Sequence, residues 1–359
     1  MVKKISLIFF SLLISIIFCE ILVRSFYPQN MKGYYLEQNE SGLWKLKKNY
    51  KYYDHFRGET FVYKTGPLRN RVTDTVQNNK EKILILGDSF TFGYRLHDKD
   101  TYVSKLQNRF EDYHFINSAS PNWGLSDYSR YIEDYCETFE SKKIIIFINT
   151  DDIGRVNKSN QYFLEDNIII RGKQLKYYAW YTKYYEQPII NLILSHSHLI
   201  RFVAKRLLDL SRLIINHQGK KISKNTNELE IFYPLRILKT EKEVNFYIKK
   251  SKMIIKRLKK NAEICNLNLY FIYSGWVNFE NENKNFTTLN PNLVFFREAD
   301  NFFKSLNIKF FNNTNDLIME DVNINRFKYI IKNDHHPNKL GSEKIFNAVK
   351  DDVETILNY

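Results

Sequence analysis

Two segments far apart in the chain carry the residues best suited to chemistry. A Gly-Asp-Ser turn ending at Ser89 follows an apolar run, and an Asp-His-His-Pro-Asn segment at 334–338 lies near the carboxyl terminus. A serine hydroxyl becomes a good nucleophile when a base removes its proton, and an imidazole has a suitable pKa. Asp334 precedes His336 by two residues, so on an extended or turn segment both side chains can point at one site. We therefore expect Ser89 as nucleophile, His336 as base and Asp334 as the acid that orients the imidazole.

The turn itself favours this chemistry. Gly87 lets the backbone bend, so Ser89 stands at the start of the next helix. The N-terminus of a helix offers free N–H groups and a positive dipole to a developing oxyanion. Caps and turns favour serine for other reasons as well, so the prediction depends on Asp334 and His336. His335 is expected to be a neighbour of the site.

Together these residues resemble the GDSL-type SGNH hydrolases, whose motif blocks are a Gly-Asp-Ser turn, a Gly, an Asn and an Asp-x-x-His or Asp-x-His segment. Residues 87–89 match the first block and residues 334–338 the last, and the resemblance covers the chain from about residue 80 to its end. It implies a three-layer α/β/α, flavodoxin-like fold with a mainly parallel sheet. It also implies that Ser89 forms an acyl-enzyme and that its backbone N–H is one donor of the oxyanion hole.

The two middle blocks depart from the pattern. Asn122 stands where a Gly N–H is expected, and an Asn tolerates the left-handed backbone that such a position requires; Gly124 could instead fill this role after a loop shift. Asp151 stands where an Asn amide should bind the oxyanion, and an ionised carboxylate would repel it. Three arrangements remain open: Asn149 reaches in, Asp151 is protonated, or the hole uses backbone donors alone. Loss of one side-chain donor costs about 2.7–4 kcal/mol in such sites, which predicts slow rather than absent activity.

The elements that must position these residues alternate regularly. Nearly continuous apolar runs, typical of strands buried on both faces of a parallel sheet, recur between helical segments. The predicted strands span 82–86, 114–117, 143–148, 269–273 and 308–311, and the predicted helices span 101–110, 126–140, 241–265, 293–306 and 341–357. Ligands bind at the carboxyl ends of such strands, which is where the predicted catalytic residues lie.

The N-terminal segment is apolar with a positive flank. Lys3 and Lys4 precede an uncharged run that Glu20 interrupts and that resumes through Val23, reaching the roughly 20 residues of a spanning helix. A cleaved secretory signal is the alternative, but no small-x-small cleavage site follows the run. We expect an uncleaved signal anchor at 1–27, with the lysines in the cytoplasm and the rest on the periplasmic or extracellular side of a bacterial cell.

The rest of the chain divides into three predicted parts. Residues 28–80 indicate a stalk and lead-in segment, and residues 81–359 indicate the hydrolase-like domain. A helical insertion at about 157–240 interrupts that domain, with a helix-prone stretch at 177–185, an amphipathic helix at about 189–215 and a polar linker at 218–227. We expect the basic amphipathic helix to pack against the core; a position at the membrane surface is the alternative.

Composition excludes several classes of protein. The formal net charge is +14, from 54 Lys+Arg and 40 Asp+Glu, but the lysines are spread along the chain and no segment is typical of nucleic-acid binding. Three cysteines at Cys19, Cys136 and Cys265 exclude a disulfide scaffold and a zinc site of ordinary spacing. A Cys136–Cys265 bridge is open, with buried free thiols preferred. We predict no metal site and no cofactor.

We therefore predict a membrane-anchored serine hydrolase that acts on ester-linked acyl groups, with O-acyl groups of cell-envelope glycans as the substrate class. An acylated small molecule is the alternative substrate. The glycan substrate rests on analogy with anchored members of the family. Two alternatives remain. One is a polysaccharide O-acyltransferase that uses the same residues, and the other is a non-catalytic glycan-binding or assembly protein, which the residues at 122 and 151 favour.

Overall fold

The computed structural model describes residues 2–30, 35–72, 80–157, 161–165, 168–171, 197–204, 206–207, 240–275, 291–313, 328–331, 334 and 336–359. The chain forms two compact units. The first contains Met1–Tyr34 and Lys176–Leu229, and the second contains Tyr35–Leu175 and Glu230–Tyr359.

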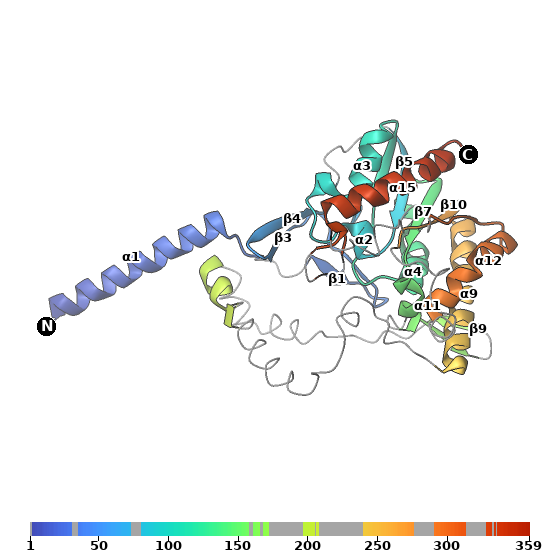
Figure 1. The fold of residues 1–359 in the computed structure, drawn as a ribbon. Helices are drawn as coiled ribbons and strands as arrows, with labels where there is room; N and C mark the ends of the chain where they lie inside the picture. Colours follow the sequence, from blue (N-terminus) through green and yellow to red (C-terminus); the bar gives the residue numbers. More distant parts are fainter. Residues whose placement is uncertain are drawn as a thin grey trace. The chain divides into compact units, whose positions relative to one another are not determined.

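The second unit is built on a five-stranded sheet in which every pair of neighbouring strands is parallel (Figure 1). Its strands are β5 (Glu81–Leu86), β6 (Tyr113–Asn117), β7 (Lys143–Ile148), β10 (Asn268–Tyr273) and β11 (Lys309–Phe311), in the order β11-β10-β7-β5-β6. Taken in chain order this is the flavodoxin-like arrangement, and it confirms the predicted fold class. The chain reverses its direction of winding between β5 and β7, so the loops after these two strands border the place where such sheets bind ligands.

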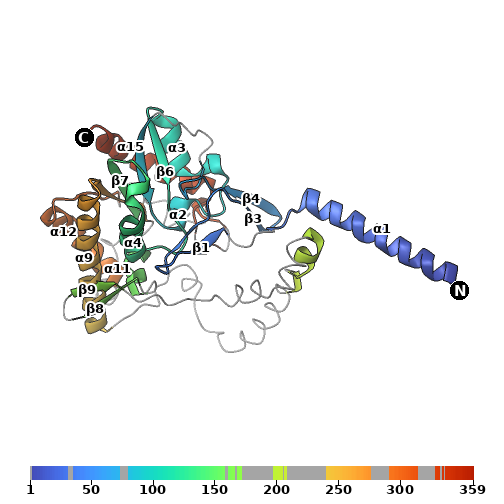
Figure 2. The ribbon, with the colours of Figure 1, turned by 180° about the vertical axis from the view of Figure 1, so that it is seen from behind.

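Helices cover both faces of the sheet, as Figures 1 and 2 show from opposite sides. One face packs Ile83 and Ile85 against α3 (Tyr102–Arg109) and α15 (Lys339–Leu357). The other packs Leu84 and Leu86 against a second group of helices, because successive side chains of a strand point to opposite faces. That group comprises α4 (Leu125–Tyr135), α9 (Glu241–Ile264), α11 (Pro291–Arg297) and α12 (Ala299–Ser305). The helix predicted at 293–306 is thus two helices, separated by a turn at Glu298.

Short helical turns occupy the loops that leave the sheet. They are α2 (Ser89–Phe92), η1 (Asp98–Asp100), η2 (Cys136–Thr138), α5 (Asp151–Gly154) and η3 (Arg155–Asn157). Two of them, α2 and α5, directly follow β5 and β7, so they carry the predicted nucleophile and the third motif block.

The described residues of the second unit also form three antiparallel hairpins. They are β1 (Leu36–Gln38) with β2 (Trp44–Leu46), β3 (Lys51–Phe56) with β4 (Glu59–Lys64), and β8 (Tyr162–Glu165) with β9 (Ile168–Arg171). The turn of the β3–β4 hairpin has positive φ at both Arg57 and Gly58, the backbone that two-residue hairpin turns favour. The segment expected to be an irregular stalk therefore contains two hairpins, and Tyr63 of β4 is fully buried beside Phe92 of α2.

The first unit contains α1 (Val2–Phe26), which is long and apolar enough to cross a membrane. Its most apolar window has a mean hydropathy of 2.6 and contains no buried residue. A second helix is described at residues 198–204 and 206–207. The stretch predicted at 177–185, the polar linker at 218–227 and the remainder of the helix predicted at 189–215 lie outside the described residues.

A disulfide joins Cys136 to Cys265, with 6.0 Å between their Cα atoms. This corrects the preference for free thiols. The two cysteines follow the ends of α4 and α9, which pack against each other, so the bridge ties together two neighbouring helices. Cys19 in α1 is free and exposed.

Candidate active site

The Gly-Asp-Ser turn is fixed by tight packing and a helix cap. A Cβ atom on Gly87 would lie 2.0 Å from Oγ1 of Thr91, so only glycine fits there. The Asp88 side chain caps α2 by accepting a hydrogen bond from the N–H of Phe90 at 2.9 Å. Ser89 is the first residue of that helix and is 5% exposed. Because no turn of helix precedes Ser89, its backbone N–H has no carbonyl partner within the helix. This N–H is therefore suited to donate to an oxyanion.

The segment that carries His336 is held at both ends. The N–H of Ile331 donates to the carbonyl of His336 at 2.9 Å, and the N–H of Asp334 donates to the carbonyl of Ile331 at 2.8 Å. Asn338 then caps α15, accepting from the N–H of Gly341 at 3.0 Å, while its amide donates to the carbonyl of Ile330 at 3.1 Å. This cap explains why an Asn after the His-Pro pair is useful, since it ties the loop to the helix.

Asp334 and His336 hydrogen-bond to each other. Nδ1 of His336 and Oδ1 of Asp334 form a short hydrogen bond, and the backbone N–H of His336 donates to the same oxygen at 3.0 Å. The imidazole packs against the α2 segment: its ring centre lies 5.8 Å from that of Phe90 and 4.8 Å from that of Tyr94. The structure thus brings His336 beside the residue that follows Ser89. His335 lies outside the described residues.

A residue that the sequence did not suggest, Arg95, holds the other oxygen of Asp334. Burial alone would raise the pKa of Asp334, but the hydrogen bonds and charge of His336, together with the charge of Arg95, hold that pKa well below its usual range. Arg95 also lies 3.6 Å from the carboxylate of Asp54, and its guanidinium lies over the ring of Phe56. Both contacts come from the β3 strand, so the β3–β4 hairpin supports the acid of the site.

A second unpredicted arginine, Arg155, joins the loops at the carboxyl ends of three strands. Its NH1 group donates to Asp88 at 2.8 Å, to the carbonyl of Trp123 at 2.9 Å and to Asp152 at 3.3 Å. Burial and the nearby charge of Asp88 raise the pKa of Asp152 well above its usual range. Burial would lower the pKa of Arg155, but the carboxylates around it raise that pKa.

Some of the polar groups near the predicted oxyanion hole already form hydrogen bonds or ion pairs within the protein. The N–H of Gly124 donates to Asp127 at 3.0 Å, so Gly124 is committed to capping α4. Asn122 has a φ of 67°, the left-handed backbone that the sequence anticipates. The carboxylate of Asp151 lies 3.5 Å from Arg155, and its N–H donates to Oδ1 of Asn149 at 2.8 Å.

The amide of Asn149 is engaged as well. Its Nδ2 donates to Oδ2 of Asp88 at 2.6 Å, and its backbone N–H donates to Asp152 at 2.9 Å. Its side chain therefore braces the Gly-Asp-Ser turn from the end of β7. The backbone N–H groups of Ser89 and Asn122 remain as the candidate donors.

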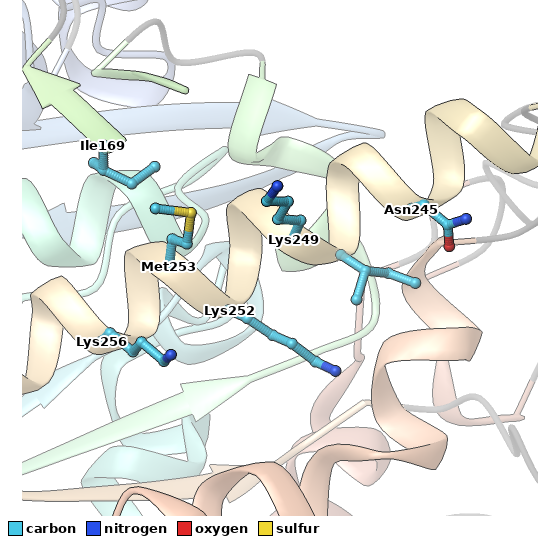
Figure 3. A pocket seen from close by; sticks show the side chains of 7 residues that line it. Ile169, Asn245, Lys249, Lys252, Met253 and Lys256 are labelled. Carbon is cyan, nitrogen blue, oxygen red and sulfur yellow. The ribbon is translucent and has the colours of Figure 1, made fainter. Parts of the chain in front are cut away.

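Within the described part of the chain, no group of three or more His, Cys, Asp or Glu side chains is arranged to hold a metal ion. A separate hollow of about 580 Å³ lies beside α9 (Figure 3). Its lining residues are Ile169, Asn245, Ile248, Lys249, Lys252, Met253 and Lys256. None of them belongs to the loops that carry the predicted catalytic residues.

No protein-family model matches the chain. No curated protein matches it either. Three solved structures that resemble it are a psychrotrophic esterase from Pseudoalteromonas sp., a member of the lipolytic G-D-S-L family from Veillonella parvula and an acetyl xylan esterase. Their identities are 13%, 12% and 12%, and their TM-scores are 0.41, 0.40 and 0.37. The alignments cover 78%, 76% and 76% of this chain and 100%, 97% and 99% of those chains. The likeness is a general one, and the function is inferred below from the geometry of the site.

Proposed function

We propose that this chain is a serine ester hydrolase in which Ser89 is the nucleophile, His336 the base and Asp334 its orienting acid. The observation that carries the proposal is the Asp334–His336 pair, packed against Phe90 and Tyr94 at the turn that carries Ser89. Because Asp334 accepts the hydrogen bond at Nδ1, that nitrogen carries the proton and Nε2 is left as the base.

The reaction follows from these roles. Ser89 Oγ attacks the ester carbonyl carbon as its proton passes to Nε2 of His336, and the N–H groups of Ser89 and Asn122 stabilise the oxyanion. The bond to the alcohol oxygen then breaks as His336 returns the proton to it, leaving an acyl group on Ser89. Water, activated by the same imidazole, attacks this ester, and the acid and free Ser89 are released.

The catalytic unit is anchored in the membrane by α1 and faces the periplasm or the outside of a bacterial cell in this proposal. Two observations support that location. No residue in the apolar window of α1 is buried, and two lysines precede it. The Cys136–Cys265 disulfide suits an oxidising compartment, because disulfides are rare in the reducing cytosol.

We further propose that the substrate is an O-acyl group on a cell-envelope glycan. The location supports this choice, since acylated polysaccharides are ester substrates that an exported, anchored enzyme can reach. One of the resembling structures is an acetyl xylan esterase, an activity that is described for that protein and not for this chain.

Labelling with a fluorophosphonate tests the proposal. The detergent-solubilised full chain is expected to label at Ser89, and the Ser89→Ala variant is expected not to label. His336→Ala should fold and label far more slowly, because the hydroxyl then lacks its base. If the wild-type protein fails to label while it still retains an acylated glycan, the enzyme proposal is wrong and a glycan-binding role replaces it.

Product analysis separates hydrolysis from transfer. With p-nitrophenyl acetate alone, a hydrolase releases acetate at the rate of p-nitrophenol. If acetate appears on an added oligosaccharide in preference to water, the chain is an O-acyltransferase that uses the same three residues. Ser89→Ala serves as the control for both outcomes.

A further inference from the structure

The second helix of the first unit begins at a cap supplied by α1. The carboxylate of Glu20 accepts hydrogen bonds from Ser197 Oγ at 2.8 Å and from the N–H groups of His198 and Leu199 at 3.0 and 2.8 Å. Backbone N–H groups at the start of a helix lack partners within it, so Glu20 satisfies them. Residues 198–204 and 206–207 are called the capped helix below.

Further contacts fix which way the capped helix faces. The N–H of Gln29 donates to Nδ1 of His198 at 2.8 Å, and the rings of Tyr27 and Phe202 meet edge to face with 5.4 Å between their centres. Arg201 is 7% exposed and donates to a carbonyl of the segment after α1. One side of the capped helix is therefore turned towards the chain that follows α1.

The opposite side is apolar and exposed. Ile200, Val203 and Leu207 are 43%, 47% and 62% exposed. Their spacing of three and four residues places them on one face of a helix. Exposed apolar stripes of this kind are typical of surfaces that contact another apolar phase.

The neighbouring surface indicates which phase that is. Both helices belong to the same unit, and no residue in the apolar window of α1 is buried. Glu20 lies in the last third of α1, where a spanning helix meets the membrane–water boundary, and an uncapped carboxylate deeper in the hydrocarbon would be costly. The capped helix, whose first turn is bonded to Glu20, thus begins at the level of the interface.

We propose that the capped helix lies in the membrane interface, with Ile200, Val203 and Leu207 in the lipid. This inference rests on the proposed anchoring by α1. Exposed Arg206, which lies over the rings of Tyr27 and Phe202, suits the phosphate level of the bilayer. The chain then attaches to the membrane at two points in its sequence, one before and one after the segment with the Gly-Asp-Ser turn.

Site-directed fluorescence on the full chain tests this. In a Cys19→Ser background, single cysteines at Val203→Cys, Leu13→Cys and Phe246→Cys are labelled with an environment-sensitive dye; the bridged Cys136 and Cys265 do not react. Phe246 of α9 is the matched control, since it is also helical, apolar and 42% exposed. The proteins are reconstituted into phosphatidylcholine–phosphatidylglycerol vesicles with nitroxide-labelled lipids.

We expect the lipid nitroxides to quench the dye at positions 13 and 203. At position 246 we expect quenching by aqueous iodide and none by the lipid nitroxides. Glu20→Ala, which removes the cap, is expected to reduce lipid quenching at 203 and to leave that at 13 unchanged. Lipid quenching at 13 without lipid quenching at 203 overturns the interfacial helix but leaves the anchor intact. Absence of lipid quenching at both positions overturns the anchor, and the interfacial helix with it.

Discussion

The guanidinium of Arg95 pairs with Oδ2 of Asp334, while His336 occupies Oδ1 of the same carboxylate. Each oxygen of the acid therefore has its own partner, and the imidazole cannot exchange one oxygen for the other without displacing Arg95. Arg95 is itself held by Asp54 and Phe56 of the β3 strand. The β3–β4 hairpin, which precedes the five-stranded sheet in the sequence, thus positions Asp334 through Arg95, which lies more than two hundred residues before it.

Arg95→Ala is expected to reduce kcat for p-nitrophenyl acetate by about 10–100-fold, with KM little changed, because small displacements of a catalytic group are costly. Arg95→Lys should restore part of the rate by returning one donor. Arg109→Ala, which removes an exposed arginine paired with Glu354 on α3 and α15, is the control and should retain full activity. Equal rates for the Arg95 and Arg109 variants would refute the positioning role.

Arg155 is expected to matter more for folding than for the chemical step. Arg155→Met leaves Asp88 and Asp152 buried without their cation, and breaking such a pair costs about 3–5 kcal/mol. The double variant Arg155→Met/Asp88→Asn should recover part of that loss, since it removes the charge of Asp88. Urea unfolding measures both; a double variant no more stable than the single one contradicts the assignment.

The sequence predicted most of the sheet because its strands are buried on both faces. The strand predicted at 143–148 is reproduced to the residue in β7, and the predicted strands at 82–86 and 269–273 each gain one residue in β5 and β10. Continuous runs of isoleucine and leucine of this kind are typical of such buried strands, so few other secondary-structure assignments fit them. The hairpins of the lead-in segment were missed because their strands are short and mix aromatic with charged residues, so period-two alternation is weak.

The pairing of Asp334 with His336 could be predicted because the two residues are close in sequence. Arg95 and Arg155 could not, since each contacts partners that only the fold brings near, such as Asp334 and Asp88. A surface arginine and a buried one look the same in the sequence when their partners are distant. The weak clue for Arg155 was its place three residues after the Asp-Asp pair of the third block.

The backbone N–H of Asn122 is a proposed donor of the oxyanion hole, and substitutions at this position test that role. Asn122→Gly keeps the N–H and relaxes the left-handed φ of 67°, so kcat should be unchanged or higher. Asn122→Val is expected to lower kcat, because a β-branched residue is strained at positive φ and would move the donor. Steady-state rates with p-nitrophenyl acetate and a thermal melt of each variant make the comparison. If the valine variant keeps both its rate and its melting temperature, Asn122 is not a donor.

The raised pKa of Asp127 predicts that the stability of the folded chain depends on pH. Burial raises its pKa to about 7, although the N–H of Gly124 and the charge of Arg155 oppose the rise. A raised pKa in the folded state means that the folded chain binds the proton more tightly, so stability falls as the pH rises from about 4 to about 7. Asp127→Asn keeps the acceptor and cannot ionise. Its advantage over the wild type in urea unfolding should grow by roughly 2–4 kcal/mol between pH 4 and pH 8, and an advantage that is the same at both pH values would contradict this.

The Cys136–Cys265 disulfide should stabilise the second unit substantially, because it closes a loop with a sequence separation of 129. Removing a bridge of this kind costs about 2–5 kcal/mol. The variant Cys136→Ser/Cys265→Ser should therefore unfold at lower urea, and dithiothreitol should destabilise the wild type but not this variant. Cys19→Ser is the matched control, since that thiol is free, and it should respond to dithiothreitol as the wild type does.

The redox state of the same two cysteines in the cell tests the proposed export. When bacteria are quenched in acid and their protein is dissolved in denaturant, an alkylating reagent of high mass should modify Cys136 and Cys265 only after reduction. Modification without reduction would show that the unit resides in a reducing compartment, and the proposed export would be wrong.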